Sequence, residues 1–436
     1  MRTAIALVTR DLRVRDNPAL ALACANAERV VPLFVRDPTM PGGAVRWRFL
    51  DECLADLRGS LRDRGGDLVI RHGDVVAETL RLAGEVDATL VTVAGDVSSL
   101  ARRRERRLAE ECETHRIELV VTPGVTVVPP GALRPAGGAA SYRVFTPYWR
   151  AWTAATWRDV APTPRRLTLP PGLDPGPLPP PGETPGAAAS ARSAVGGEAA
   201  ARRTLRAFLP HLSGYAQEHD VLASPGTSRL SPYLRFGCLS PRELAGVAAG
   251  SEEFVRQLCW RDFFYQVTAA FPRINRDPLR PGGDVWRADD AAFAAWRDGR
   301  TGVPVVDAGM RQLAAEGWMH NRARMITAAF LTKHLGLDWR LGAGVFFDLL
   351  LDGDVPNNYG NWQWVAGTGN DTRPYRRFNP IRQAYRFDPD GDYVRRYVPE
   401  LSVVDGPAVH EPWRLGRDLR YPPPLRGPAP AAWLPD

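Results

Sequence analysis

The sequence predicts an α/β protein with an N-terminal doubly wound parallel-sheet domain and a C-terminal all-helical domain. Through residues 1–125, short apolar runs alternate with amphipathic stretches, which is the pattern of parallel strands alternating with helices on both faces of a sheet. From about residue 200 to residue 400, strand-like runs mostly disappear and helical periodicity dominates. At 436 residues, the chain is long enough to bury two or three domain cores.

Five apolar runs in the N-terminal part are the predicted strands, and amphipathic stretches such as 44–64 and 100–115 are predicted helices between them. Sheets of this kind bind ligands beyond the carboxyl ends of their strands. No G-x-G-x-x-G motif follows the first strand, so a dinucleotide crevice is not indicated. The predicted strands are residues 3–8, 30–35, 68–71, 88–93 and 117–122.

A proline-rich segment separates the two predicted domains. Residues 161–200 are too rich in proline to pack, so we expect an exposed linker there. The aromatic segment 142–152 is expected to lie against a domain surface. The predicted boundaries are 1–130 for the α/β domain, 131–200 for the interdomain linker and 201–436 for the helical domain.

The chain carries a formal net charge of +7, which favours a polyanionic partner. Lys333 is the only lysine among 56 basic residues, and arginine suits forked contacts with phosphates and bases. A GC-rich coding bias is the alternative and explains most of the preference for arginine. That bias does not explain why seven of the 13 tryptophans lie between residues 260 and 364.

The five cysteines are scattered without a C-x-x-C pair, so neither a zinc knuckle nor an iron–sulfur cluster is supported, and no metal site is predicted. Scattered thiols are typical of the reducing cytosol. Asp11 and Arg13 soon follow the first apolar run, which argues against a signal peptide. No apolar run reaches the roughly 18 residues that a bilayer requires. We therefore expect a cytoplasmic protein that does not enter a membrane.

Two Ser-Pro pairs predict helix starts. At the first, Ser240 caps the helix, the next proline takes the first helical position, and Glu243 reaches back. The second begins at Ser231, just after Thr227, Ser228 and Arg229, and free N–H groups with the helix dipole favour a phosphate there. The alternative is a simple N-cap, the commoner explanation of a lone Ser-Pro. The clustered hydroxyls and the arginine shift the interpretation toward a phosphate.

Two predicted helices each carry tryptophan beside arginine and an amide side chain at spacing i, i+3, i+4 and i+7, which defines one helix face. Two such faces could sandwich and hydrogen-bond a base. For either face alone, a core tryptophan with an arginine reaching to water is the better explanation, and the two together favour a pocket. The faces consist of Gln257, Trp260, Arg261 and Phe264, and of Trp318, Asn321, Arg322 and Met325.

Arg324 lies two residues past Arg322, about 200° round the helix, so it points elsewhere. Asp352 or Asp354 is a natural partner for it. An ion pair beside a cofactor and a plain structural ion pair both remain open at this point.

Trp362 and Trp364 are also two residues apart, so in a helix they would face different surroundings. Trp286 and Trp339 are further candidates for an aromatic chain. Each of these residues taken alone is typical of a protein core.

These motifs resemble those of the DNA photolyase/cryptochrome family, most closely the bacterial class I members that repair cyclobutane pyrimidine dimers. The resemblance covers nearly the whole chain except the linker and the last few residues. Many long motifs in the right order make it specific. The matching segments are residues 10–20, 226–237, 257–263, 301–313, 317–325, 351–354, 361–364 and 378–380.

The resemblance implies an α/β antenna domain and a helical domain that binds FAD and DNA. In such proteins, excited reduced FAD donates an electron to a cyclobutane dimer flipped out of UV-damaged DNA, the dimer splits, and the electron returns. The resemblance also implies a monomeric lyase without an obligate protein partner.

The resemblance assigns roles to the motif residues. FAD phosphates and sugar would be held by Tyr215, Thr227, Ser228, Arg229, Leu230 and Ser231. The flavin would be lined by Arg324, Asp352, Gly353, Asp354 and Asn358, with Asn358 facing N5. The lesion would be contacted by Gln257, Trp260, Arg261, Asn321, Arg322, Met325 and Trp364. The electron relay from the surface to the flavin would be Trp286, Trp339 and Trp362.

Gln257 departs from the family's pattern, because members that repair cyclobutane dimers usually carry Glu there. Enzymes that repair (6-4) photoproducts, and animal cryptochromes, tend to carry Gln, which can still hydrogen-bond a thymine edge but cannot accept as an anion. The (6-4) enzymes, however, carry a His pair where this chain has Asn321 and Arg322, and His in place of Met325. These three matches outweigh the one mismatch.

The segment 356–361 is the second departure, since bacterial repair enzymes usually have an Ala-rich stretch and Asn-Asn-Gly-Gly before the tryptophan. Either Asn357 or Asn358 could face N5, and counting back from Trp362 favours Asn358.

Three residues predict an antenna pigment. Arg46 and Asp96 match positions that contact 8-hydroxy-5-deazaflavin in related enzymes, and Arg235 is a further candidate. The matches favour deazaflavin over 5,10-methenyltetrahydrofolate. An empty site and ordinary surface charges are the alternatives.

Three other functions remain open beside repair of cyclobutane dimers: repair of (6-4) photoproducts, a cryptochrome-type blue-light photoreceptor, and a non-enzymatic DNA-binding flavoprotein. Signalling members often carry a long C-terminal extension, and this chain stops soon after residues 410–414. We therefore expect repair.

Overall fold

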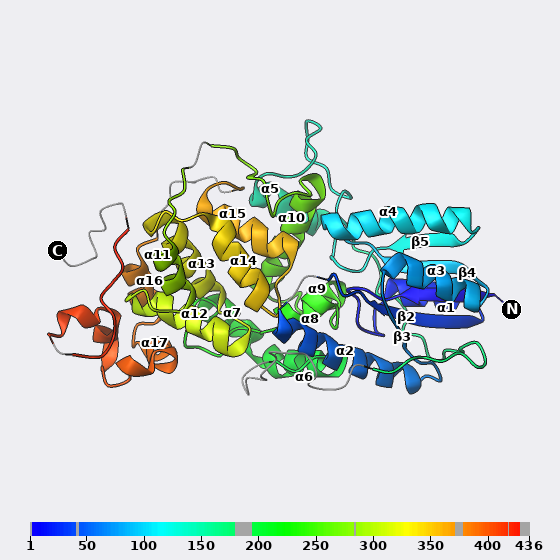
Figure 1. Ribbon diagram of the computed structural model, residues 1–436, viewed down its shortest axis with the longest axis horizontal. Helices are drawn as coiled ribbons and strands as arrows, with labels where there is room; N and C mark the ends of the chain where they lie inside the picture. Colours follow the sequence, from blue (N-terminus) through cyan, green and yellow to red (C-terminus); the bar gives the residue numbers. More distant parts are fainter. Residues whose placement is uncertain are drawn as a thin grey trace. The chain divides into compact units, whose positions relative to one another are not determined.

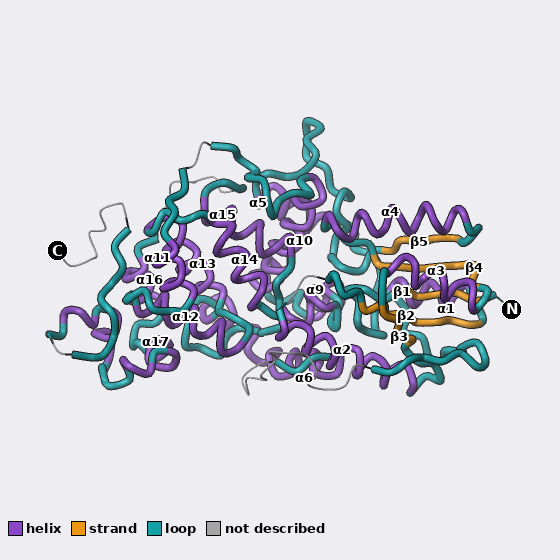
Figure 2. Tube along the Cα trace, viewed as in Figure 1, coloured by secondary structure: helices purple, strands orange, loops and turns teal. Residues whose placement is uncertain are grey.

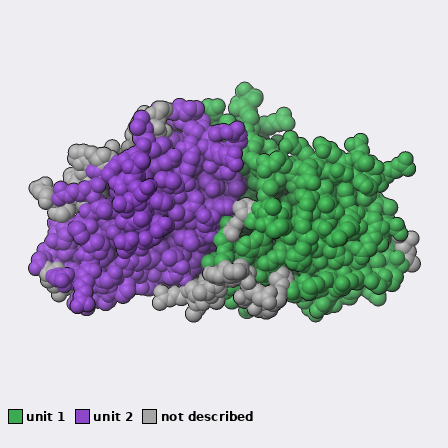
Figure 3. Space-filling model, viewed as in Figure 1, with its two compact units in different colours: residues 1–188, 194–212, 228–272 green, residues 189–193, 213–227, 273–436 purple. Residues whose placement is uncertain are grey.

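The computed structural model describes residues 2–40, 43–178, 194–282, 285–370, 378–416 and 418–427. The chain divides into two compact units (Figure 3): unit 1 is residues 1–188, 194–212 and 228–272, and unit 2 is residues 189–193, 213–227 and 273–436. The predicted helical domain is thus shared between the units, because helix α10 (Glu252–Ala270) packs against α5 (Phe145–Ala154) inside unit 1. The two units are defined by which residues pack together and not by function, so the predicted domain boundaries stay a prediction.

The predicted α/β fold class is confirmed, because unit 1 contains five parallel strands in the order β3-β2-β1-β4-β5 (Figures 1 and 2). Ile5 on β1 lies opposite both Val31 and Val91, and all three side chains are fully buried. Burial on both faces is the rule for parallel sheets. The strands are β1 (Thr3–Leu7), β2 (Arg29–Arg36), β3 (Val69–His72), β4 (Ala88–Ala94) and β5 (Glu118–Thr122).

Four helices connect the strands, and side-chain caps fix where three of them begin. The side chains of Asn17, Asp74 and Ser98 accept first-turn N–H groups of α1, α3 and α4. Right-handed crossovers place α1 on one face of the sheet and α3 with α4 on the other, because the strand order reverses at β1. The helices are α1 (Pro18–Asn26), α2 (Ala44–Arg62), α3 (Val75–Glu85) and α4 (Ser99–Thr114).

The remaining helices of unit 1 begin only partly as predicted. Ser240 caps α9, as expected, by accepting the N–H groups of the second and third helical residues. The prediction that Glu243 reaches back is wrong, because its carboxylate pairs with Arg202 at 2.9 and 3.0 Å. Ser231 is the first residue of α8 and does not cap it. These helices are α5, α6 (Glu198–Phe208), α8 (Ser231–Phe236), α9 (Pro241–Val247) and α10.

The proline-rich segment is not a free linker over its described part, residues 161–178, so that prediction is wrong there. The carbonyl of Thr168 accepts from Val30 N–H, and that of Pro175 accepts from Ile70 N–H, at 2.9 and 2.7 Å. Leu167 is buried. A proline lacks the N–H donor but keeps its carbonyl, so a Pro-rich chain can still accept bonds from strand backbones. The rest of the predicted linker, residues 179–193, lies outside the described residues.

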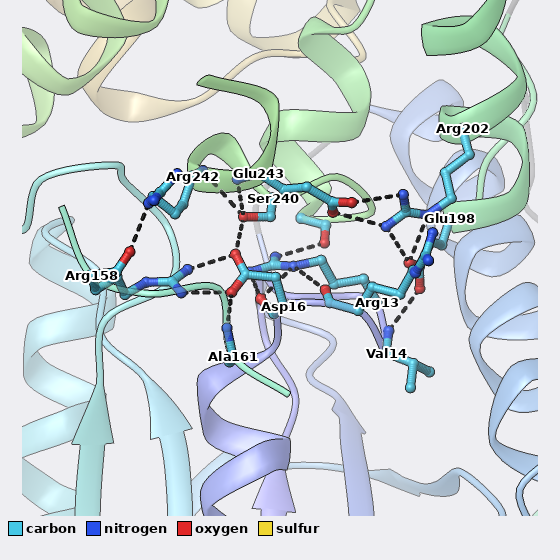
Figure 4. Close-up of polar contacts among 12 residues, drawn as sticks. Arg13, Val14, Asp16, Arg158, Ala161, Glu198, Arg202, Ser240, Arg242 and Glu243 are labelled. Carbon is cyan, nitrogen blue, oxygen red and sulfur yellow. Dashed lines mark hydrogen bonds and ion pairs between the residues drawn. The ribbon is translucent and has the colours of Figure 1, made fainter. Parts of the chain in front are cut away.

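A buried polar network holds the loop that follows β1 (Figure 4). Asp16 is fully buried and accepts from both Nη atoms of Arg158 at 2.6 and 2.7 Å, from Ala161 N–H at 2.7 Å, and from the Ser240 hydroxyl. Burial alone would raise the pKa of Asp16, but the hydrogen bonds from Arg158 and Ser240 lower it. Arg13, 1% exposed, donates to the carbonyls of Arg15, Asp16, Gly124 and Gly237.

The same network reaches helix α6. Glu198 accepts the N–H of Val14 at 2.7 Å and pairs with Arg202, which also binds Glu243 of α9. The network therefore ties the loop after β1 to α6, to α9 and to residues 158–161, all within unit 1.

Unit 2 consists of helices around one apolar core that contains Trp296, Trp339 and Trp362. Gly342 on α14 packs so closely on the Trp362 ring that an added Cβ would collide with it. Within the described part of the chain, no helix is long and apolar enough to cross a membrane. The helices are α7 (Tyr215–Glu218), α11 (Asp290–Arg297), α12 (Pro304–Glu316), α13 (Asn321–Ala329), α14 (Trp339–Leu349), α15 (Gly360–Ala366), α16 (Pro380–Phe387) and α17 (Asp392–Tyr397).

Shorter turns complete the fold. Two are π-helical, η2 (Phe330–His334) and η3 (Val355–Tyr359), and each continues or precedes an α-helix. The 3₁₀ turns are η1 (Leu209–Gly214), η4 (Pro399–Leu401), η5 (Gly406–His410) and η6 (Pro412–Arg414).

We expect the substitution Asp16→Ala to lower the free energy of unfolding by about 3 kcal/mol, because it leaves the half-buried Arg158 guanidinium and two other donors without their acceptor. Urea denaturation measures the change. The control is Glu118→Gln, whose partner Arg2 is 42% exposed while Glu118 is 59% exposed. This control should change the free energy by less than about 1 kcal/mol. Similar losses in the two variants would contradict the role assigned to the network.

Candidate functional site

The predicted flavin-lining residues include an ion pair in unit 2. Nη1 and Nη2 of Arg324, on α13, lie 3.0 and 2.8 Å from the two carboxylate oxygens of Asp352. The Nε of Arg324 donates to the carbonyl of Met319 at 2.8 Å. Of the two partners that the sequence left open, Asp352 and Asp354, the structure selects Asp352. The guanidinium is therefore held in one orientation by two adjoining segments.

Asp354 caps the π-helical turn η3, and Asn358 lies within it. The side chain of Asp354 caps this turn by accepting the backbone N–H of Asn357 at 2.8 Å and its Nδ2 at 3.2 Å. Asn358 is 8% exposed, and its Nδ2 donates to the carbonyl of Ala343 at 2.9 Å. No donor to Asn358 Oδ1 is found among the described residues, which leaves that oxygen as an acceptor. π-Helical turns occur often at functional sites.

The three tryptophans of the predicted relay belong to one region of unit 2. Trp339 and Trp362 are buried in the core, and the half-buried Trp286 packs against it. Trp362 contacts Trp296 and Phe346, with ring centroids 6.0 and 5.0 Å apart, and no ring stacking joins any two of the three described relay tryptophans. The relay stays a prediction.

The second tryptophan-bearing face is not a single helix face, so that prediction is wrong for Trp318. Helix α12 ends at Glu316, the next residue, Gly317, has a left-handed φ of +62°, and α13 begins only at Asn321. Left-handed glycine is the usual end of a helix, because other residues adopt that conformation at a cost. Asn321, which is exposed, and the half-buried Met325 do share α13, whereas Trp318 precedes it.

His320 fixes the start of α13. Its Nδ1 accepts the N–H of Arg322 at 3.1 Å, so the ring hydrogen lies on Nε2. Its own backbone N–H donates to Oε1 of Gln312 at 3.1 Å, and the Tyr393 hydroxyl donates to the same oxygen at 2.7 Å. Burial lowers the pKa of His320 to about 4, so the ring is neutral at neutral pH.

Arg322, a predicted lesion contact, is engaged inside unit 2. Its Nε and Nη2 pair with Asp220, and its guanidinium carbon lies 4.2 Å above the ring of Phe387. On α15, Trp362 is buried whereas Trp364 is half-buried, so the two differ in surroundings as expected.

The predicted FAD phosphate and sugar residues are divided between the units. Tyr215 and Thr227 belong to unit 2, where the Tyr215 ring stacks on His219 with centroids 4.9 Å apart. The others belong to unit 1, where Arg229 is exposed and has a left-handed φ of +50°. Leu230 is buried, and its N–H donates to the hydroxyl of Ser228 at 3.4 Å. Ser231 is half-buried at the start of α8.

The first tryptophan-bearing face lies on one helix, α10, as predicted. The Trp260 ring stacks flat on Phe145 of α5, with centroids 3.7 Å apart and an interplanar angle of 3°. Arg261 donates to the carbonyl of Val125 at 2.6 Å and lies over the Tyr265 ring. Gln257 is half-buried. One face of Trp260 is thus covered, and Arg261 is committed to contacts within unit 1.

Two of the three antenna candidates, Asp96 and Arg235, contact Arg10 near the carboxyl ends of β1 and β4, where the strand order reverses. This is where open α/β sheets bind ligands. Asp96, directly after β4, pairs with Arg10 at 3.2 Å, and Arg10 also donates to the carbonyl of Arg235. Burial alone would raise the pKa of Asp96, but the Arg10 charge lowers it. Asp96 and Arg104 line a small cavity here, whereas Arg46 is buried in α2 and does not line it.

Two buried polar residues near the predicted site have positioning contacts that the sequence did not reveal. Gln363, fully buried between Trp362 and Trp364, accepts from Leu279 N–H at 2.8 Å and donates to the carbonyls of Ile274 and Asp277. Asp262 on α10 accepts from the N–H groups of Val127 and Val128 and from Trp152 Nε1. Burial raises the pKa of Asp262 to about 6. The sequence did offer a signal for these contacts: an amide or a carboxylate stands inside an apolar motif, and such a side chain needs hydrogen-bond partners when it is buried.

We expect His320→Asn to reduce the acid sensitivity of the fold. The folded pKa of His320 lies below the ordinary value of 6.5, so the unfolded chain binds a proton first as the pH falls, and stability is lost from about pH 6.5 down to about pH 4. Asparagine can still cap α13 but does not titrate. Between pH 7.5 and pH 5, the wild type should lose about 2 kcal/mol more than the variant in urea denaturation. The exposed His72→Asn serves as the control and should keep the wild-type slope; equal slopes in all three proteins would refute the assignment.

Comparison with known proteins identifies the family. Residues 4–167 match the DNA photolyase family, and residues 254–425 match the FAD binding domain of DNA photolyase. The deoxyribodipyrimidine photo-lyase of Streptomyces griseus is 48% identical over 98% of this chain and 96% of its own length. The cryptochrome DASH of Natronomonas pharaonis is 37% identical over 95% of this chain and 94% of its own length.

Solved structures give the same result. A bacterial class III photolyase from Agrobacterium tumefaciens superposes with a TM-score of 0.89 at 35% identity, covering 96% of this chain and 91% of its own. An archaeal photolyase from Sulfolobus tokodaii, solved with two FAD molecules, gives a TM-score of 0.84 at 29% identity, covering 98% and 96%. The chain therefore belongs to the DNA photolyase/cryptochrome family, and its second half is that family's FAD-binding domain.

Proposed function

We propose that this protein is a light-driven lyase that repairs cyclobutane pyrimidine dimers in DNA with FAD as its cofactor. The observation that carries the proposal is the group formed by the Arg324–Asp352 ion pair, Asp354 and Asn358, inside the residues that match the FAD-binding domain. The relative named deoxyribodipyrimidine photo-lyase, at 48% identity, supports the reaction class.

The residues present fit a flavin. The Asn358 carboxamide is fixed by its bond to the Ala343 carbonyl, and its oxygen is left able to accept a hydrogen bond such as the N–H of a reduced flavin would supply. Arg324 offers a positive charge that Asp352 holds in place and partly neutralises. FAD, when bound, supplies a photoexcitable electron donor, and hydrogen bonds and charges beside its ring nitrogens tune that donor. The protein's contribution is to hold the Arg324 guanidinium and the Asn358 carboxamide in fixed orientations.

We propose that residues of α10, α13 and α15 contact the lesion. Trp260 is clamped flat on Phe145, so it presents a rigid plane on which an unstacked base could lie, which is worth about 1–3 kcal/mol. Gln257, one turn earlier on the same helix, carries an amide that can donate to and accept from a pyrimidine edge. We assign Asn321, Met325 and Trp364 to the same role. Arg322 and Arg261 are weaker candidates, because their guanidinium groups are bound within the protein.

Two specific observations favour other functions in the same family. Gln257 fits repair of (6-4) photoproducts, and the 37% identity to a protein named cryptochrome DASH fits a photoreceptor. The assignment to class I is also a proposal, since a class III photolyase superposes with a TM-score of 0.89.

We propose an antenna pigment at the ends of β1 and β4, with 8-hydroxy-5-deazaflavin as the first choice and 5,10-methenyltetrahydrofolate as the second. The Arg10–Asp96 pair at the strand-order reversal supports a ligand there. The Sulfolobus tokodaii photolyase, solved with two FAD molecules, is described as implying a novel light-harvesting cofactor, so a further pigment is an outcome to test for. We further propose that the protein acts as a cytoplasmic monomer.

The deciding experiment illuminates the chemically reduced protein with separate oligonucleotides that carry one cyclobutane dimer or one (6-4) photoproduct, followed by chromatography of the products. We expect the cyclobutane dimer to be restored to two pyrimidines and the (6-4) lesion to remain. Restoration of the (6-4) lesion alone would show a (6-4) repair enzyme instead. If neither oligonucleotide were repaired, the proposal of a repair enzyme would fall and a photoreceptor would be the better assignment.

A matched pair of variants tests the lesion face. Trp260→Ala should weaken binding of the dimer by about 1–3 kcal/mol, because it removes the stacking plane. Trp149→Ala removes a half-buried tryptophan of α5 that neighbours the same Phe145 ring but is outside the predicted set, and it should leave binding unchanged. Equal losses would return Trp260 to a packing role.

A further inference from the structure

Two cysteines far apart in the sequence meet in unit 1. The Sγ atoms of Cys53, on α2, and Cys238, directly after α8, lie 3.3 Å apart, although 185 positions separate the residues. Both side chains are completely buried. No such sulfur contact is found for the other three cysteines, all of which belong to the described residues.

Packing beside both cysteines holds the two sulfurs in place. Phe49, one helical turn before Cys53, contacts the rings of Tyr233 and Phe236 on α8, with centroids 5.6 and 4.9 Å apart. Gly237, just before Cys238, has a left-handed φ of +72°, and an added Cβ would collide with the backbone of the loop after β1. The contact between α2 and α8 is therefore a fixed feature of the packing.

We propose that Cys53 and Cys238 are a buried dithiol that closes to a disulfide when the protein meets hydrogen peroxide. One thiol sulfur attacks a peroxide oxygen, which gives a sulfenic acid and one water. The second thiol sulfur then attacks the sulfenic sulfur, the S–S bond forms, and a second water leaves. Overall, two thiols lose two electrons and two protons, and one peroxide becomes two waters. The sulfurs need only close from 3.3 Å to the bond length of about 2.05 Å.

Burial sets the rate of this reaction. Desolvation raises the pKa of the Cys53 thiol well above its ordinary value, so the reactive thiolate is scarce. Oxidation therefore depends on transient local opening and should be slow. The same burial protects the finished bond from reductants.

The bond would join α2 to the end of α8, the helix that begins at Ser231. The sulfurs lie 185 positions apart, so the cross-link closes a long loop and restrains the unfolded chain strongly. We expect the oxidised protein to melt a few degrees higher than the reduced protein. This inference is independent of the proposed function, since it concerns only the fold of unit 1.

The test treats the folded, reduced protein with hydrogen peroxide, blocks remaining thiols with N-ethylmaleimide, denatures the protein and digests it with trypsin without reductant. Mass spectrometry should find residues 49–58 joined to residues 236–242, and this species should separate on reduction. Of the five thiols, the half-buried Cys24 should react first, and the thiols of Cys53 and Cys238 should then disappear together and more slowly. Melting of the two forms by calorimetry measures the stabilisation.

Two variants control the experiment. Cys53→Ser should abolish both the linked peptide and the rise in melting temperature, whereas Cys112→Ser, a buried cysteine outside the pair, should keep both. The proposal is overturned if Cys53 and Cys238 are both still recovered as free thiols after prolonged exposure to peroxide, long after Cys24 has been consumed. It is also overturned if the linked peptide forms only in denaturant, because the folded contact would then not direct the bond.

Discussion

The ion pair between Arg324 and Asp352 is the contact on which the candidate flavin site depends. It joins the first turn of α13 to the turn that follows α14, and the Met319 carbonyl holds the third side of the guanidinium. Removing two ions from water costs several kcal/mol each, so such a pair is retained only with good geometry and further hydrogen bonds. Here the neighbouring segments supply both, since His320 caps α13 and Asp354 caps η3.

A similar arrangement recurs in both units: a buried polar side chain forms hydrogen bonds with backbone groups of a loop that has no helix or strand partner for them. Asp16 holds the segment near residue 161, Asp262 holds residues 127–128, and Gln363 holds the loop at 274–279. Asp307 accepts from the N–H groups of Thr301 and Gly302 and from two hydroxyls. Loops carry most binding residues, and rigid support keeps them in place before a ligand arrives.

The alternation of apolar runs predicted the bounds of all five strands to within two residues. A parallel sheet is buried on both faces, so its strands are short, continuous apolar runs that the sequence shows directly.

The ends of helices were harder to predict from the sequence. Trp318 has helical spacing with Arg322, yet Gly317 ends one helix and His320 caps the next, so spacing alone misled. Glu243 fits a capping box but pairs with Arg202, a partner that no local pattern reveals. The Pro-rich segment binds the sheet through its backbone carbonyls, and amino-acid composition gives no sign of such hydrogen bonds. The positioning contacts of Gln363 and Asp262 are likewise long-range.

The most direct test of the account is the FAD content of the purified protein, measured by absorbance after release, in wild type, Asp352→Asn and Asp277→Asn. Asp277 forms an exposed pair with Arg273 in the same unit and serves as the matched control. We predict that the wild type and the control carry stoichiometric FAD and that Asp352→Asn loses most of it, because Arg324 loses the charged, two-point partner of its Nη atoms. A wild type that neither contains FAD nor takes it up on reconstitution, or an Asp352→Asn protein with full FAD content, would contradict the account.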